Sequence, residues 1–166
     1  MSRVMSVAYT EQAVRDRIKT VTRRKGWWED KNGRRILKPG DRLTLCRKVM
    51  GRRKGEPLDR ICEVEVVSVR RERLGRLTDE TPELFPTEYA LQEVRAEGFP
   101  RMRPEEFVER YFIDAQRIYP DHDVTRIEWR YVDRCLCVEN NPGDDPEGCY
   151  CDCSDYGRPG CIHGEE

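Results

Sequence analysis

The sequence predicts an α+β fold built around a small, strongly curved antiparallel sheet or β-barrel with flanking helices. Two observations carry this prediction. Segments rich in alternating or β-branched hydrophobic residues occur before residue 75 and again after residue 123, whereas residues 78–119 show helical spacing. The expected order is therefore strand, helix, several strands, helices and strand, which is typical of an α+β protein.

The first expected strand is RVMSVAY, residues 3–9, and a helix over residues 11–18 follows it. Thr10 is expected to cap this helix, because a threonine hydroxyl can accept a bond from a free backbone N–H. Residues 19–41 contain the turn signals Gly26, Asn32-Gly33 and Pro39-Gly40, so they are predicted as one long loop. Long loops in compact domains usually carry function.

Two further strands are expected over residues 42–50 and 60–74, separated by the basic turn MGRRKGEPLD. Cys46 and Cys62 lie in these strands and are expected as small buried core residues. Helices are expected in TEYALQEVRAEGF, which follows Pro86, and in RPEEFVERYFIDAQRIY. The second helix would place Phe107, Tyr111, Phe112 and Ala115 on one stripe. The segment VTRIEWRYVDRCLCV returns to strand.

The composition is highly charged but compatible with a folded core. Charged residues make up 38% of the 166 residues and hydrophobic residues 37%, which differs from the composition of a disordered chain. The sequence contains no signal-peptide pattern and no run approaching the roughly 20 apolar residues of a membrane helix. We therefore expect a soluble cytoplasmic protein without a membrane partner, whose eight cysteines are mostly reduced.

The net charge of −1 conceals an asymmetry between the two halves. The first 76 residues carry 22 Lys and Arg against 10 Asp and Glu, whereas the remaining residues carry 9 against 22. A basic half indicates a phosphate-bearing partner. The alternative is that the acidic half folds back and neutralises the basic half.

The stretch IKTVTRRKGWW, residues 18–28, concentrates cations beside two tryptophans. Lys19 and Thr22 are three residues apart, so on a helical turn they would face one pocket. Arg23 and Arg24 repel the proton of Lys19, which would let Lys19 act as a general base toward a Thr22 nucleophile. The alternative is that the cations neutralise phosphates and the threonines only donate hydrogen bonds.

The paired segments IKTVTRRKGWW and LKPGDRLTL resemble the signature of the ASCH family, a branch of the PUA-like barrels. The residues that match its Lys-Thr-x-Thr-x-Arg and Gly-Asp motifs are Lys19, Thr20, Thr22, Arg24, Gly40 and Asp41. The Glu-Gly-Phe at residues 97–99 and the closing segment VTRIEWRYV also fit. The glycine that usually precedes the lysine is absent, and RDRI stands there instead. The resemblance spans residues 4–132 and implies an ASCH domain over residues 1–134.

The resemblance implies a barrel with a cleft that binds RNA or a nucleotide. One branch, the bacterial N4-acetylcytidine amidohydrolases, uses a lysine, a threonine and a glutamate that fall here on Lys19, Thr22 and Glu97. Three functions follow as hypotheses: RNA or nucleotide binding without catalysis, hydrolysis of an N4-acylated cytidine or related modified nucleoside, and ribonuclease activity. None of them requires a cofactor at the Lys/Thr/Glu site.

The ligand contacts expected around these three residues are base stacking and phosphate binding. Base stacking would come from the two tryptophans, although one of them is expected to pack against the barrel instead. Phosphate would be held by the basic segment and by the turn that follows the third strand. The predicted binding residues are Thr20, Arg23, Arg24, Trp27, Trp28, Arg52, Arg53 and Lys54.

Residues 135–166 form a Cys-rich acidic appendage with few aliphatic residues. A metal is the usual means of ordering such a segment where disulfides are disfavoured, and zinc takes four Cys or His ligands. The alternatives are free thiols on a disordered tail, or disulfides formed on oxidation. The predicted zinc ligands are Cys149, Cys153, Cys161 and His163, with Cys135, Cys137 and Cys151 as alternates.

Overall fold

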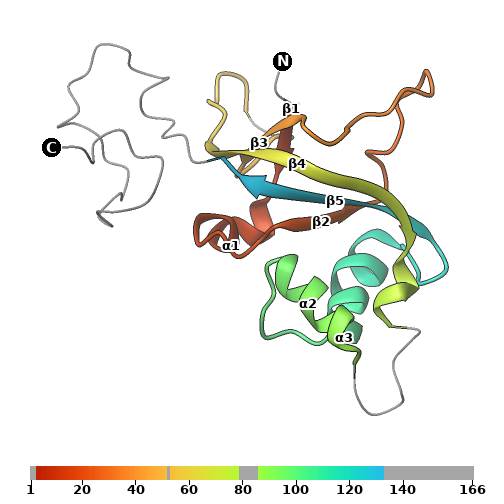
Figure 1. Cartoon of the computed structure of the whole chain (residues 1–166). Helices are drawn as coiled ribbons and strands as arrows, with labels where there is room; N and C mark the ends of the chain where they lie inside the picture. Colours follow the sequence, from red (N-terminus) through yellow and green to blue (C-terminus); the bar gives the residue numbers. More distant parts are fainter. Residues whose placement is uncertain (1–2, 52, 79–85, 133–166) are drawn as a thin grey trace, which may run out of the picture.

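The computed structural model describes residues 3–51, 53–78 and 86–132, and it contains one curled five-stranded sheet (Figure 1). The strand order is β1-β3-β4-β5-β2, and every neighbouring pair is antiparallel except the parallel pair β1 and β3. The α+β class is therefore confirmed, as a half-barrel sheet with helices. The strands are β1 (Arg3–Ser6), β2 (Val21–Arg24), β3 (Arg42–Cys46), β4 (Arg60–Arg73) and β5 (Asp123–Tyr131).

The curl of the sheet follows from the length and irregularity of β4. This strand pairs with β3 at its start and with β5 along most of its length. The register with β5 shifts between Val66 and Ser68, and such a bulge bends a strand and increases its twist. One face, the core face, carries the main hydrophobic cluster, to which all of the strands except β2 contribute. The cluster contains Met5, Val7, Val14, Leu37, Leu43, Leu45, Val64, Val66, Ile127 and Trp129.

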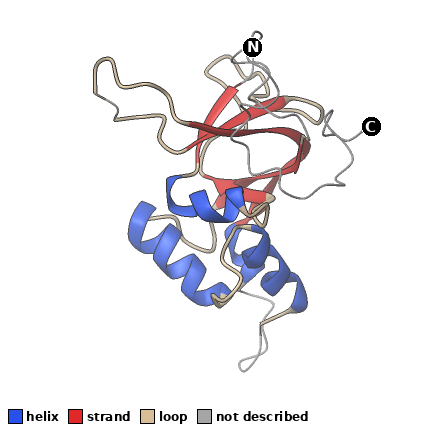
Figure 2. Cartoon of the chain, turned by 90° about the vertical axis from the view of Figure 1, so that its left-hand side faces the viewer, coloured by secondary structure: helices blue, strands red, loops and turns tan. Residues whose placement is uncertain are grey.

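The helices gather on one side of the sheet (Figure 2). They are α1 (Glu11–Arg15), α2 (Glu88–Ala96) and α3 (Pro104–Val108), and α3 continues as a π-helical turn over Glu109–Asp114. Thr87 caps α2, because its hydroxyl accepts a hydrogen bond from the backbone N–H of Ala90 at 3.2 Å. Within the described residues, none of the helices combines the length and the apolar character that crossing a bilayer requires.

The π-helical turn changes which side chains of the predicted stripe are buried. In a π-helix residues five apart share a face, so Phe107 and Phe112 both enter the second core cluster, which the helices form with the short helical turn Leu74–Leu77 and with β5. Tyr111 is half-buried at the edge of this cluster, whereas Ala115 is exposed. The prediction that Ala115 belongs to the buried stripe is wrong for this reason.

Three predictions about residues 10–41 are also wrong. The predicted loop contains a strand, β2, because β-branched Val21 and Thr22 pair with β5. Helix α1 ends at Arg15, and Lys19 lies in the irregular segment between α1 and β2. Thr10 occupies the N-cap position without a capping bond, since its hydroxyl donates to the Val7 carbonyl at 3.4 Å.

The two strand cysteines differ in their exposure. Cys46 is fully buried, as predicted, whereas Cys62 is only half-buried against the main core cluster. Burial still raises the pKa of the Cys62 thiol to about 11. A thiol with that pKa is protonated at neutral pH, which fits a packing role better than a reactive one.

The Arg24 side chain bridges the open edges of the half-barrel. Strands β1 and β2 are the two edges of the sheet. The Arg24 guanidinium of β2 donates through Nη2 to the Ser6 carbonyl of β1 at 2.6 Å. Arg24 therefore connects edges that share no backbone ladder.

Candidate functional site

The Lys19 side chain is buried beside the end of α2, with 3% of the residue exposed. Its ammonium donates to two oxygens of Glu97, the backbone carbonyl at 2.6 Å and carboxylate Oε2 at 3.0 Å. Burial lowers the pKa of Lys19, and the charges of Arg24 and Arg23 act in the same direction, although Glu97 opposes them. The site therefore holds a desolvated amine that loses its proton more readily than an exposed lysine.

The backbone of Lys19 is fixed from two directions. Its carbonyl accepts a hydrogen bond from Trp129 Nε1 at 3.1 Å and another from the Tyr131 hydroxyl at 2.6 Å. The next residue, Thr20, donates its N–H to the Ala96 carbonyl at 2.8 Å. These bonds attach the Lys19 segment to β5 and to the C-terminus of α2. The backbone from which the amine extends is thus held by two separate elements.

Gly98 lets the chain leave α2 directly after Glu97. Its φ is +99°, and a Cβ built there would lie 2.9 Å from the Cβ of Ala13 on α1. We expect Gly98→Ala to lower the free energy of unfolding by about 2–4 kcal/mol, because both the left-handed backbone and the close contact oppose a side chain. Gly26→Ala is the matched control, since Gly26 has open space and no positive φ. Equal effects in denaturant titrations of the two variants would contradict this account.

Arg23 lies in the centre of a buried ion network on the helix face, the face of the sheet that α2 covers. Its guanidinium donates to Glu72 Oε1 at 2.8 Å, to Glu97 Oε1 at 3.1 Å and to the carboxylate of Glu93. Only 3% of Arg23 is exposed. Since all three of these partners are carboxylates, the charge of Arg23 is neutralised within the protein.

Arg126 and Arg70 extend this network along the row that begins at Arg23. The three arginines occupy directly opposed register positions on β2, β5 and β4. Arg126 donates to both oxygens of Glu93 at 2.7 and 2.8 Å and to Glu128 at 2.7 Å. Arg70 donates to Glu72 at 3.0 Å. Every arginine of the row therefore has at least one carboxylate partner.

The pKa of Glu93 reports this pairing. Burial alone would raise it, but the hydrogen bonds and charges of Arg126 and Arg23 outweigh burial and lower it. Glu93 therefore contributes stability that is present above the carboxyl pKa of the unfolded chain. That contribution is lost as the pH falls through the lowered pKa of the folded state.

Thr22 and Arg24 lie on the opposite face of β2 from Arg23. Thr22 is 4% exposed and pairs with Ile127 of β5, a member of the main core cluster. The prediction that Lys19 and Thr22 share a helical face is wrong, because Thr22 is in a strand. In this structure both hydrogen bonds of the Lys19 ammonium go to Glu97 and neither goes to Thr22.

The two tryptophans have different neighbours. Trp27, at a positive φ of 71°, is half-buried against the main core cluster. Trp28 is also half-buried, and the guanidinium of Arg35 lies over its ring. Trp27 packs on the sheet, as expected for one of the two tryptophans, but the other is not exposed, because Trp28 is half-buried with a cation over its ring.

The basic turn between β3 and β4 lies outside the Lys19 network. Arg53 and Lys54 are exposed, and the side chain of Arg52 falls outside the described residues. Arg53 and Lys48 line a hollow of about 590 Å³ together with Gly51 and Glu56. Among the described residues, no hydrogen bond or ion pair links Arg53 or Lys54 to the network.

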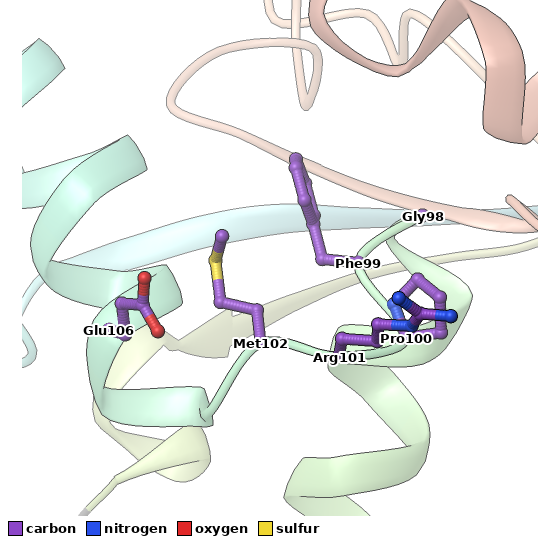
Figure 3. Close-up of a pocket in the computed structure, with 6 residues that line it drawn as sticks. All are labelled: Gly98, Phe99, Pro100, Arg101, Met102 and Glu106. Carbon is purple, nitrogen blue, oxygen red and sulfur yellow. The ribbon is translucent and has the colours of Figure 1, made fainter.

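A second hollow, of about 300 Å³, begins one residue after Glu97 (Figure 3). Figure 3 shows Phe99 and Met102 projecting from the segment between α2 and α3, with Glu106 on α3 opposite them. The centroid of the Phe99 ring lies 4.5 Å from that of Tyr111, with the two rings tilted by 36°. The hollow is lined by Gly98, Phe99, Pro100, Arg101, Met102 and Glu106.

The predicted zinc ligands all belong to residues 135–166, which lie outside the described residues, and so does the domain boundary at residue 134. Among residues 3–51, 53–78 and 86–132, no group of three or more His, Cys, Asp or Glu side chains is arranged to hold a metal ion. Zinc binding by the tail stays a prediction, and metal analysis of the full chain purified without chelator is its test.

Sequence reasoning missed most of the acidic half of the site. Glu93 lies on α2 and Glu97 is its C-cap residue four positions later, and two like charges at that spacing destabilise an isolated helix. This repulsion between the two glutamates indicates that cations from other elements neutralise this face of the helix. The residues that the sequence did not single out are Arg70, Glu72, Glu93, Arg126, Glu128, Trp129 and Tyr131.

Comparisons with known proteins add little to this geometry. No protein-family model matches the chain, and no curated protein matches it. Among solved structures the chain is similar to protein EF3133 from Enterococcus faecalis V583, described with the family model DUF984. The identity is 14%, the TM-score is 0.48, and 80% of each chain is covered. We therefore infer the function from the site itself.

Proposed function

We propose that the chain is an ASCH-type protein that binds RNA, a nucleotide or a modified nucleoside at the segment from Lys19 to Arg24. The observation that carries the proposal is the pairing of a desolvated Lys19 amine with Glu97 beside the Trp129 ring, whose centroid lies 5.9 Å from Nζ. Residues of the Lys-Thr-x-Thr-x-Arg motif and of the downstream Glu-Gly-Phe, far apart in the sequence, thus meet in one place. Arg24 supplies a cation that no carboxylate of the described residues hydrogen-bonds.

Binding as a function of salt concentration tests this proposal. We expect a labelled single-stranded RNA of about ten nucleotides, or CMP, to bind more weakly as salt rises, because each neutralised phosphate releases counterions. Arg24→Gln should weaken binding and flatten the salt dependence. Lys38→Gln removes the same charge from an exposed position and should leave both nearly unchanged.

The possible outcomes of this experiment are distinguishable. Salt-independent binding of cytidine would point to an uncharged nucleoside as the ligand. No binding of RNA, CMP or cytidine at any salt concentration would contradict the proposal. If Lys38→Gln weakens binding as much as Arg24→Gln does, the ligand binds elsewhere.

A second candidate, hydrolysis of an N4-acylated cytidine, is favoured by the lowered pKa of Lys19. In this mechanism neutral Lys19 leaves Glu97 and takes the proton of the Thr22 hydroxyl, while the Thr22 oxygen attacks the acyl carbonyl. The C–N bond breaks, and the amine of cytidine leaves with a proton returned by Lys19. Water then hydrolyses the Thr22 ester and releases the carboxylic acid. Glu97 holds Lys19 in position before and after the transfer.

A further inference from the structure

We propose that Thr125, together with Arg24 and Arg71, forms a phosphate subsite on the core face of the sheet. The inference rests on the proposed function and makes it more specific, because it assigns the site a phosphorylated nucleoside as ligand. Thr125 is in β5, and sequence reasoning did not select it.

The three residues form one row across three strands. Arg24 of β2 is directly opposite Thr125 of β5, and Thr125 is directly opposite Arg71 of β4. Directly opposed residues of antiparallel strands project from the same face with their Cβ atoms roughly 5 Å apart. Their neighbours Thr22 and Ile127 place this row on the core face.

Two buried side-chain atoms in the described part of the chain lack a hydrogen-bond partner, and both belong to this row. They are Nε of Arg24 and the hydroxyl oxygen of Thr125. Thr125 is completely buried. Buried polar groups in folded proteins are nearly always paired. Two unpaired groups on directly opposed residues therefore indicate that a polar group of a ligand binds between them.

The charge of the row indicates which kind of group this is. On the helix face the row Arg23, Arg126 and Arg70 has carboxylates for every cation. On the core face Arg24 donates to a neutral carbonyl. Arg71 forms a long ion pair with Asp123, in which Nη2 and Oδ2 are 3.9 Å apart. Within the described residues no carboxylate hydrogen-bonds Arg24, and Glu97 acts on it only through its charge. A buried guanidinium without a hydrogen-bonded anion is costly, so an anionic oxygen beside Arg24 would stabilise this row.

A phosphate group fits the donors of this row. Arg24 Nε and the Thr125 hydroxyl would donate to its oxygens, and Arg71, whose side chain is 37% exposed, would approach from the solvent side. Because Thr22 lies on the same face two residues before Arg24, the rest of a nucleotide would extend toward Lys19. The preferred ligand is then a nucleoside monophosphate rather than a nucleoside.

Thr125→Val tests the subsite because it removes the hydroxyl and keeps the shape. Removing an unpaired buried hydroxyl should raise the Tm of the free protein, by about 2–4 °C. The same change should weaken CMP binding about tenfold to a hundredfold and leave cytidine binding unchanged. Thr44→Val, a buried threonine on β3 whose side chain lies on the other face, is the matched control and should not change CMP affinity.

Calorimetric titration with CMP, cytidine and inorganic phosphate separates the outcomes. An unchanged CMP affinity in Thr125→Val, or a lower Tm of this variant than of the wild-type protein, would overturn the subsite. If neither CMP nor cytidine binds the wild-type protein, the proposed function fails. In that case the subsite stands only if phosphate raises the Tm of the wild-type protein and not that of Thr125→Val.

Discussion

Arg23→Met is expected to lower the free energy of unfolding by about 3–5 kcal/mol, a large part of the stability of a typical domain. Arg23 donates hydrogen bonds to Glu72, Glu93 and Glu97, and it is almost completely buried. Methionine fills a similar volume but carries no charge. The loss therefore comes mainly from carboxylates that stay buried without their shared partner.

Arg130→Met is the matched control for this substitution. Arg130 also forms an ion pair, with Glu65 at 2.7 Å, but its side chain is 69% exposed. Exposed ion pairs contribute little to stability, so we expect a change of less than about 1 kcal/mol. Denaturant unfolding at neutral pH measures both variants. Similar losses in the two would show that burial does not determine the strength of the network.

The pH dependence gives an independent check of the same network. Glu93 contributes stability above the carboxyl pKa of the unfolded chain, because Arg126 and Arg23 lower its pKa in the fold. In Arg23→Met one of these cations is missing, so the variant accepts a proton on Glu93 more readily. The difference in the free energy of unfolding between the wild-type protein and the variant should therefore shrink as the pH is lowered toward 4, near the carboxyl pKa of an unfolded chain.

The strands were predictable where the local sequence agrees with its packing. β4 and β5 contain β-branched residues on both faces of the sheet, and the predictions match both ends of β4 and the start of β5 to within one residue. The predicted end of the last strand, at residue 138, lies outside the described residues. β2 was not predicted, because Arg23 and Arg24 beside Gly26 look like a polar loop in isolation. The strand becomes stable only through its pairing with β5 and the carboxylates that α2 brings to Arg23.

The candidate site was predictable only in part, for a related physical reason. Lys19 and Glu97 were selected by their resemblance to a family motif, and the structure joins them by an ion pair at 3.0 Å. The partners of Arg23 come from β4 and α2, more than forty residues away, and spacing along the sequence does not indicate them. A charged sequence shows how many ionic groups exist, but only the register of the strands shows which of them are paired.

Lys19→Met is expected to reduce turnover of N4-acetylcytidine by about 10² to 10⁴-fold, if the amine is the general base of the hydrolase candidate. Methionine occupies a similar volume, and Glu97 keeps its hydrogen bond from Arg23 at 3.1 Å. The fold should therefore survive, and circular dichroism checks it. Glu97→Gln should reduce turnover less, because the backbone carbonyl of residue 97 still accepts from the amine.

Lys25→Met is the matched control, since Lys25 is an exposed lysine in the same basic segment. The Lys25→Met variant should turn over N4-acetylcytidine at the rate of the wild-type protein.

The pH profile separates a catalytic Lys19 from a structural one. A general base must be neutral, so the wild-type rate should rise with pH and level off above the pKa of Lys19. Burial lowers that pKa below the usual 10.5, and the plateau should therefore begin below pH 10.5. Residual turnover in Lys19→Met should lack this rise, because the titrating group is gone. Wild-type turnover in Lys19→Met, with the same pH profile, would show that the amine only neutralises Glu97. Binding without turnover in the wild-type protein would exclude the hydrolase candidate and leave the binding function in place.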